Sequence, residues 1–125
     1  MQKGNFYEIS PMCFPSGRKT RVMIGQNGLI KGSAFCQGYV EIDKDGSIPV
    51  HNHEVVESYS ILEGKGVFTL DGESITLAKG DFVFIEPWQN HGLKNAGEEK
   101  LIVIFVYSPQ IVVDHWDKEE KGILK

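Results

Sequence analysis

Three histidines and one glutamate stand at a spacing that suits a metal site. His51 and His53 flank a single residue, Glu57 follows four positions later, and His91 lies 34 positions beyond Glu57. Three imidazoles and one carboxylate are a suitable ligand set for a divalent transition metal. Residues two apart on a strand point to the same face, so His51 and His53 would project together, and Glu57 shares their parity. His91 must then arrive from another strand, as the inward-pointing side chains of a barrel allow.

The ordinary interpretation of a histidine is a surface residue or a hydrogen-bonded core residue. Three histidines at this spacing, with a glutamate in step, favour a shared metal site over separate structural roles. The two cysteines are far apart and form no CxxC pair, so we expect neither a structural zinc site nor a disulfide framework.

Length and composition are typical of one globular domain. The 125 residues are 41% hydrophobic and 24% charged, so we expect a single domain over residues 1–125. Its core would span about residues 20–108, after an N-terminal arm at 1–19 and before a tail or short helix at 109–125. The net charge of −4 gives no basic patch for nucleic acid. We see no signal peptide and no apolar run that spans a bilayer, and we expect a cytoplasmic protein without a membrane partner.

Glycine-punctuated, β-prone segments recur about every 8–12 residues, as in an all-β sandwich or barrel. The strands that we predict cover residues 21–24, 34–42, 58–62, 67–70, 74–77, 82–85 and 100–107. Asp71-Gly72 is the strongest turn signal, because a type I′ hairpin turn needs positive φ at both central residues. Gln37, Tyr39 and Glu41 alternate along one predicted strand and face either the barrel interior or water.

Two wider spacings surround the four candidate ligands. The first runs glycine, five residues, HxH, three or four residues, glutamate, six residues, glycine. The chain keeps it at His51, His53, Glu57 and Gly64, with Asp45 at the first glycine position. The second runs glycine, five residues, proline, any residue, glycine, two residues, histidine, three residues, asparagine. The chain keeps it at Gly80, His91 and Asn95, with Glu86 at the proline position and Trp88 at the second glycine position.

Both spacings resemble motifs of the cupin superfamily, and the resemblance covers roughly residues 20–108. It implies a single jelly-roll β-barrel in which His51, His53, Glu57 and His91 bind one divalent metal: Fe, Mn, Ni, Co or Zn. Because tryptophan adopts positive φ poorly, Trp88 predicts a turn before His91 that differs from the family norm.

Five residues are candidates for the walls of a substrate pocket: Tyr59, Phe68, Trp88, Tyr107 and Arg21. For Tyr59, Phe68 and Tyr107 we favour ordinary core packing, although a tyrosine hydroxyl that is buried also needs a partner. Trp88 either forms a pocket wall or caps the barrel mouth by packing. Arg21 either anchors an anionic group or is a surface charge, and we favour the surface charge.

The resemblance implies a metal-dependent enzyme acting on a small organic acid or a sugar-type metabolite. Dioxygenase, decarboxylase, isomerase and lyase chemistry all stay open, and no catalytic residue can be named. The alternative is a non-catalytic module that binds or senses a small molecule. We also expect a homodimer, because residues 5–14 carry Phe6, Tyr7 and other apolar side chains that would suit a partner's sheet.

Overall fold

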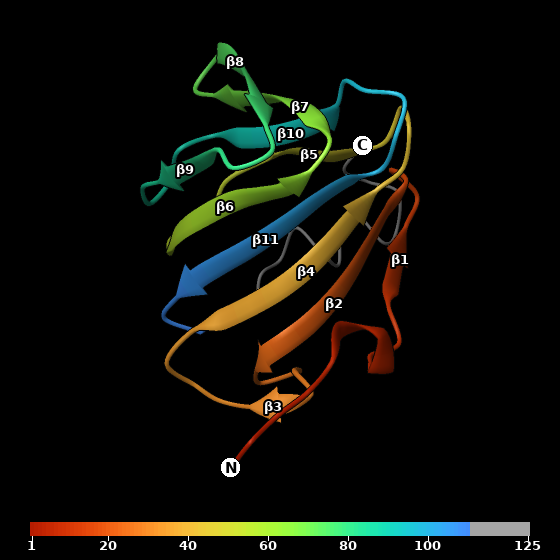
Figure 1. Cartoon of the computed structure of the whole chain (residues 1–125). Helices are drawn as coiled ribbons and strands as arrows, with labels where there is room; N and C mark the ends of the chain where they lie inside the picture. Colours follow the sequence, from red (N-terminus) through yellow and green to blue (C-terminus); the bar gives the residue numbers. More distant parts are fainter. Residues whose placement is uncertain (111–125) are drawn as a thin grey trace.

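Residues 1–110 are the part of the chain that the computed structural model describes, and they are almost entirely β-structure (Figure 1). A single 3₁₀ turn, η1, precedes the strands. The elements are η1 (Phe6–Glu8), β1 (Met12–Phe14), β2 (Arg18–Gly25), β3 (Ile30–Lys31), β4 (Cys36–Ile42), β5 (Ser47–His51), β6 (Val56–Glu63), β7 (Lys65–Leu70), β8 (Glu73–Ala78), β9 (Phe82–Ile85), β10 (His91–Asn95) and β11 (Leu101–Ser108).

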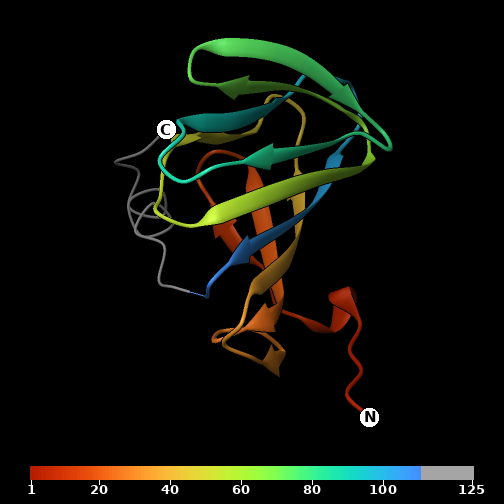
Figure 2. The same cartoon turned by 90° about the vertical axis from the view of Figure 1, so that its left-hand side faces the viewer.

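The strands form two sheets. The large sheet has the order β1-β2-β4-β11-β6-β9, with β3 paired to β2, and the small sheet has the order β5-β10-β7-β8. All pairings are antiparallel except that of β2 with β3. In Figure 2 the small sheet lies across one end of the large sheet, as in a jelly roll. The predicted all-β jelly roll is therefore confirmed.

Alternation along the strands divides the large sheet into two faces. On β11, Leu101, Val103, Phe105 and Tyr107 are buried, whereas the residues between them are only half-buried. We call the buried side, which faces the small sheet, the inner face and the other side the outer face. The core consists mainly of aliphatic and aromatic side chains: Val22, Cys36, Val40, Ile42, Ile48, Val55, Tyr59, Ile61, Phe68, Leu77, Ile85, Leu93, Leu101, Val103, Phe105 and Tyr107.

The predicted strands all appear in the structure, with bounds shifted by a few residues. Asp71 and Gly72 have φ of 47° and 86° between β7 and β8, which matches the type I′ turn that the sequence predicts. The sequence analysis did not delimit β5 or β10, the two strands that carry His51 and His91. Each contains a residue that weakens a strand pattern, namely Pro49 or Gly92.

The N-terminal arm packs on the outer face of its own sheet. The Phe6 ring stacks on Tyr39 with centroids 4.3 Å apart, and Arg21 Nε donates a hydrogen bond to the Ile9 carbonyl at 3.1 Å. Part of the apolar surface that we had assigned to a partner's sheet is thus used within the chain. The predicted C-terminal tail or helix falls mostly on residues 111–125, which lie outside the described residues. Within residues 1–110, none of the helical structure could cross a bilayer.

Candidate metal centre

The four predicted ligands converge inside the barrel, from both sheets. His51 is the last residue of β5 and lies directly opposite His91, the first residue of β10. His53 lies in the loop after β5, and Glu57 projects from β6 of the large sheet. Our expectation that His51 and His53 share one strand is therefore wrong. The loop delivers His53 to the same place because the chain crosses there from the small sheet to the large one.

Backbone carbonyls orient all three imidazoles in the same way. The Nδ1 of His51 and of His91 each donate to a carbonyl two residues earlier, at 2.6 and 2.8 Å. The Nδ1 of His53 donates to a carbonyl two residues later, at 3.0 Å. A carbonyl only accepts, so Nδ1 carries a proton in each ring and Nε2 is the atom that points into the cluster. This orientation of a ring by its second nitrogen is common among metal-binding histidines.

The ligand atoms of the cluster lie close enough to share one ion. One donor atom from each of the four residues lies within 4.8 Å of all the others. Glu57 Oε1 is 3.0 Å from His53 Nε2 and 3.2 Å from His91 Nε2. The His51 and His91 rings have centroids 4.2 Å apart. Such convergence of imidazole nitrogen atoms and one carboxylate fits a divalent cation, which would replace any protons on these nitrogens.

Burial sets the electrostatics of the centre. None of the four side chains is more than 8% exposed, and His91 is fully buried. Burial, helped by the neighbouring His91, lowers the pKa of His51 to about 3, so this ring is neutral at pH 7. Burial opposes ionisation of Glu57, but hydrogen bonds from His53 and His91 outweigh it and lower the pKa of Glu57. Burial also opposes protonation of His53, yet the contact with Glu57 outweighs it and raises the pKa of His53. The carboxylate therefore stays charged, as a metal ligand must.

The donor set fits one metal ion, with His51, His53, Glu57 and His91 as its ligands. Three neutral imidazoles and one carboxylate fill four positions, and a six-coordinate metal would keep two open. The geometry supports a single site and leaves Fe, Mn, Ni, Co and Zn equally possible.

Three of the five pocket candidates lie on the inner side, next to the centre or one ring behind it. The Tyr107 ring is 6.3 Å from His53, and the Tyr59 ring is 6.0 Å from His91, centroid to centroid. Phe68 packs edge-on against Tyr59 at 6.0 Å, within the hydrophobic core.

Trp88 has the positive φ for which glycine is the usual residue. Its φ is 67°, and Asp45, at the first motif's missing glycine, also has φ of 67°. Our prediction of a different turn is wrong in this respect: both residues adopt the left-handed conformation that glycine would take. The Trp88 N–H donates to the His53 carbonyl at 2.8 Å, which helps to hold the ligand loop. The indole itself is 64% exposed and lies outside the core.

Arg21 does not join the centre. It lies on the outer face, beside Tyr39 in the sheet register, and its Nη1 donates to Glu41 Oε1 at 2.7 Å. Gln37, Tyr39 and Glu41 therefore point away from the barrel interior, which settles the orientation that the sequence left open.

Cys36, one of the two cysteines that form no CxxC pair, is a neighbour of the centre. It pairs directly with Tyr107 across β4 and β11, and the thiol and the phenol share a hydrogen bond. Burial, together with nearby Glu57, raises the pKa of the Cys36 thiol, whereas the bond to Tyr107 opposes the rise. Only the strand register could have revealed this contact, because the two residues are 71 positions apart.

Known proteins are similar to this chain in sequence. A cupin domain model matches residues 38–107. An uncharacterized protein of Methanocaldococcus jannaschii is 29% identical over 103 residues, which cover 82% of each chain. An oxalate-binding protein of Thermotoga maritima is 32% identical over 63 residues, covering 50% of this chain and 52% of that protein.

Solved structures agree on the fold. A crystal structure from Thermotoga maritima, described as that of a predicted oxalate decarboxylase, superposes with a TM-score of 0.76 at 22% identity. The match covers 86% of this chain and 99% of that one. Together with the match of the domain model over more than half of the residues, this fold shows that the chain belongs to the cupin family.

Proposed function

We propose that the protein is a metal-dependent enzyme that acts on a small organic acid. The observation that carries this proposal is the shared orientation of the three imidazoles, whose Nδ1–H groups are all held by backbone carbonyls. Their Nε2 atoms and the Glu57 carboxylate are thereby directed to one place before any ion arrives. Such preorganisation, with coordination positions left over, is typical of catalytic metal sites.

The charge of the loaded site favours an anionic substrate. Three neutral imidazoles and the Glu57 carboxylate bring one negative charge to a divalent ion, which leaves a net positive charge. Because the four ligands are buried, this charge is poorly screened by water and attracts a carboxylate strongly. The similarity to an oxalate-binding protein supports a small acid as the ligand class.

The inner face supplies the wall against which such an acid would lie. Burial, with the neighbouring Cys36, raises the pKa of Tyr107, so its phenol stays protonated at neutral pH. Tyr59 lies on the His91 side, and Trp88 lies on the exposed turn just before that ligand. A bound metal would supply Lewis-acid or redox chemistry to a substrate in its open positions. The protein's own groups orient the acid and exclude water.

Metal reconstitution followed by a substrate screen tests the proposal. Chelator-treated protein is reloaded separately with Fe²⁺, Mn²⁺, Ni²⁺, Co²⁺ and Zn²⁺ and incubated with small mono- and dicarboxylic acids. Product formation is followed by NMR and oxygen uptake by an electrode. We expect at least one metal to support turnover that chelation abolishes and that a Glu57→Gln variant lacks.

Two outcomes would contradict the enzyme proposal. If no metal binds, the proposal fails at its first step. If a metal-loaded protein is stabilised by an acid in thermal melts but never consumes it, the non-catalytic binding module is the correct function.

A further inference from the structure

A groove lies between the last strands of the two sheets. β8 ends the small sheet, β9 ends the large sheet, and residues 79–81 join the two strands (Figure 1). The groove has a volume of about 210 Å³ and is lined by Phe68, Leu70, Glu73, Ile75, Val83 and Phe84. All of these side chains except that of Glu73 are apolar, so the groove suits a hydrocarbon group.

The strand register connects this groove to the metal centre. One row across the small sheet runs His51, His91, Leu70 and Glu73, from β5 to β8. Residues directly opposite each other on neighbouring strands point to the same face of the sheet. Leu70 therefore lies next to the ligand His91, and Glu73 lies two strands, or about 10 Å, from that ligand.

Apolar side chains that point toward the interior reach solvent at this groove. Ile75 has the same parity on β8 as the core residue Leu77, yet Ile75 is 55% exposed and Leu77 only 3%. On β9, Val83 has the parity of the buried Ile85 but is only half-buried itself. The barrel is thus open between β8 and β9, and its apolar lining is accessible from outside.

A negative charge stands at the end of the groove away from the metal centre. Glu73 is exposed at the first position of β8. Within residues 1–110, no cationic side chain forms an ion pair with Glu73. A molecule that extends from the loaded metal centre along Leu70 would therefore meet positive charge at one end and negative charge at the other.

We propose that the acid is a monocarboxylate with a short apolar chain, which lies in this groove while the carboxylate lies at the metal. This proposal rests on the function proposed above and names its substrate class. The chain passes Leu70 and ends against Ile75 and Val83. An apolar cavity of about 150 Å³ holds one benzene ring, so the groove has room for a chain of about six carbons.

Glu73 makes the groove selective against dicarboxylates. A second carboxylate at the far end of the chain would lie near the Glu73 carboxylate and be repelled. Repulsion of the wrong ligand is a common source of specificity. Leu70, Ile75 and Glu73 are thus specificity-determining residues, and none of them is a metal ligand.

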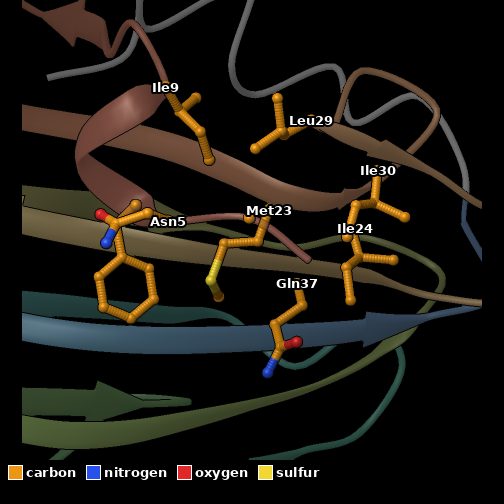
Figure 3. Close-up of a pocket in the computed structure, with 9 residues that line it drawn as sticks. Asn5, Ile9, Met23, Ile24, Leu29, Ile30 and Gln37 are labelled. Atoms are coloured by element: carbon orange, nitrogen blue, oxygen red, sulfur yellow. The ribbon is translucent and has the colours of Figure 1, made fainter. Parts of the chain in front are cut away.

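A second apolar cavity serves as a reference for unspecific binding. It has a volume of about 150 Å³ and lies between the N-terminal arm and strands β2 to β4, where Figure 3 shows Met23, Ile24 and Gln37. Ile24 and Gln37 are paired on the outer face, so the large sheet separates this cavity from the metal centre. The chain of an acid bound at the metal cannot enter it.

Calorimetry on Zn²⁺-loaded protein tests the apolar part of the groove. From propanoate to hexanoate, the affinity should rise about two- to fourfold for each added methylene, as for a partly to fully buried methylene group. Ile75→Asp should abolish this increase. Val50→Asp is the control and should keep it, because Val50 is similarly exposed (52%) but lines a different surface of the small sheet.

A pair of acids with equal chain length tests Glu73. Wild type should bind hexanoate more tightly than hexanedioate, and Glu73→Lys should shift the ratio of the two affinities toward hexanedioate by about tenfold, as expected for exposed charges. Glu99→Lys is the control for net charge. Glu99 is also exposed, but it follows the end of β10 that lies away from His91, so the ratio should stay as in wild type.

Hexan-1-ol tests the groove without a metal, because it carries the apolar chain but no carboxylate. In metal-free protein it should shift the methyl NMR signals of Leu70 and Ile75 more than that of Ile24 in the arm-side cavity. This measurement does not depend on metal uptake or turnover, so the groove can be tested even if the enzyme proposal fails.

Three results would overturn the proposal, provided that circular dichroism shows the variants to be folded. The first is hexan-1-ol that leaves the methyl signals of Leu70 and Ile75 unshifted. The second is equal affinity for propanoate and hexanoate in metal-loaded wild type. The third is a ratio of hexanoate to hexanedioate affinity that is the same in wild type and Glu73→Lys. Turnover together with any of these results would leave the enzyme proposal intact and remove only the groove.

Discussion

Two buried glutamates on the large sheet differ in their hydrogen-bond partners, which are histidines for one and arginine and lysine for the other. Glu57 on β6 faces the interior and is 6% exposed, and Glu41 on β4 faces outward and is 8% exposed. Burial opposes the charge of both, yet both have a lowered pKa because their hydrogen-bond partners outweigh that cost. For Glu41 these partners are Arg21 at 2.7 Å and Lys100 at 3.1 Å.

The two glutamates differ in whether their partners can release a proton at neutral pH. Arginine and lysine stay charged at neutral pH, so they balance the charge of Glu41. These ion pairs stabilise the outer face of the sheet next to the N-terminal arm. The partners of Glu57 are His53 and His91, imidazoles that can give up a proton and offer a lone pair to a metal. The Glu41 cluster is thus structural, and the Glu57 cluster is prepared for a cation.

The largest expected effect is stabilisation by metal. A divalent metal at about 1,000 times its dissociation constant should raise the free energy of unfolding by about 4 kcal/mol. The rise should appear in wild type and in Glu41→Gln, and it should be largely lost in Glu57→Gln. Denaturant unfolding with and without metal measures it, and equal stabilisation of all three proteins would remove the distinction between the two glutamates.

The second-largest expected effect is on metal affinity, which substitution of Glu57 should lower and substitution of Glu41 should not. Glu57→Gln removes the charged ligand and should weaken metal binding by at least about 100-fold. Mutation of residues that only orient the ligands typically weakens binding less than this. Glu41→Gln should leave the affinity unchanged, because Glu41 lies on the other face of the sheet. Competition with a chromophoric chelator gives both constants, and an unchanged affinity in Glu57→Gln would contradict its role as a ligand.

A smaller effect concerns Glu41 and pH. Glu41→Gln should cost about 1–2 kcal/mol of stability at pH 7, because it leaves Arg21 without its carboxylate partner. Since the folded pKa of Glu41 lies below that of the unfolded chain, its contribution is present above the unfolded value and is lost as pH falls through the folded value.

The gap in stability between wild type and Glu41→Gln should therefore narrow on acidification below pH 4.5, the ordinary value for this carboxyl. Urea unfolding of both metal-free proteins at a series of pH values measures the gap. A gap that stays constant or widens in acid would mean that the ion pairs contribute little.

Trp88→Gly should have the smallest effect. Glycine relieves a left-handed strain of about 1–2 kcal/mol but adds chain entropy worth about 0.5–1 kcal/mol to the unfolded state. The net change should be within about 1 kcal/mol, with unchanged metal affinity, because the N–H that holds the His53 carbonyl remains. A marked loss of affinity, seen by chelator competition, would give the indole a role at the site.

The ligand set and the fold could be predicted because they follow from fixed spacings of unusual residue types. The inner and outer faces could not be assigned, because alternation along β4 separates Glu41 from Val40 without saying which one is buried inside. For the same reason the pairing of Arg21 with Glu41, and of Cys36 with Tyr107, needed the strand register. The positive φ of Trp88 was not predicted, because the low preference of tryptophan for this conformation is a local property. The surrounding turn and the hydrogen bond to His53 enforce the positive φ.

Metal content tests the central claim most directly. Wild type, Glu57→Gln and Glu41→Gln are purified without chelator or immobilised nickel, reloaded with each candidate metal, desalted and assayed by mass spectrometry. The account predicts about one equivalent of metal in wild type and Glu41→Gln, and at most about a tenth of that in Glu57→Gln. No metal in any of the proteins, or equal metal in all three, would contradict a site built on Glu57 and the three histidines.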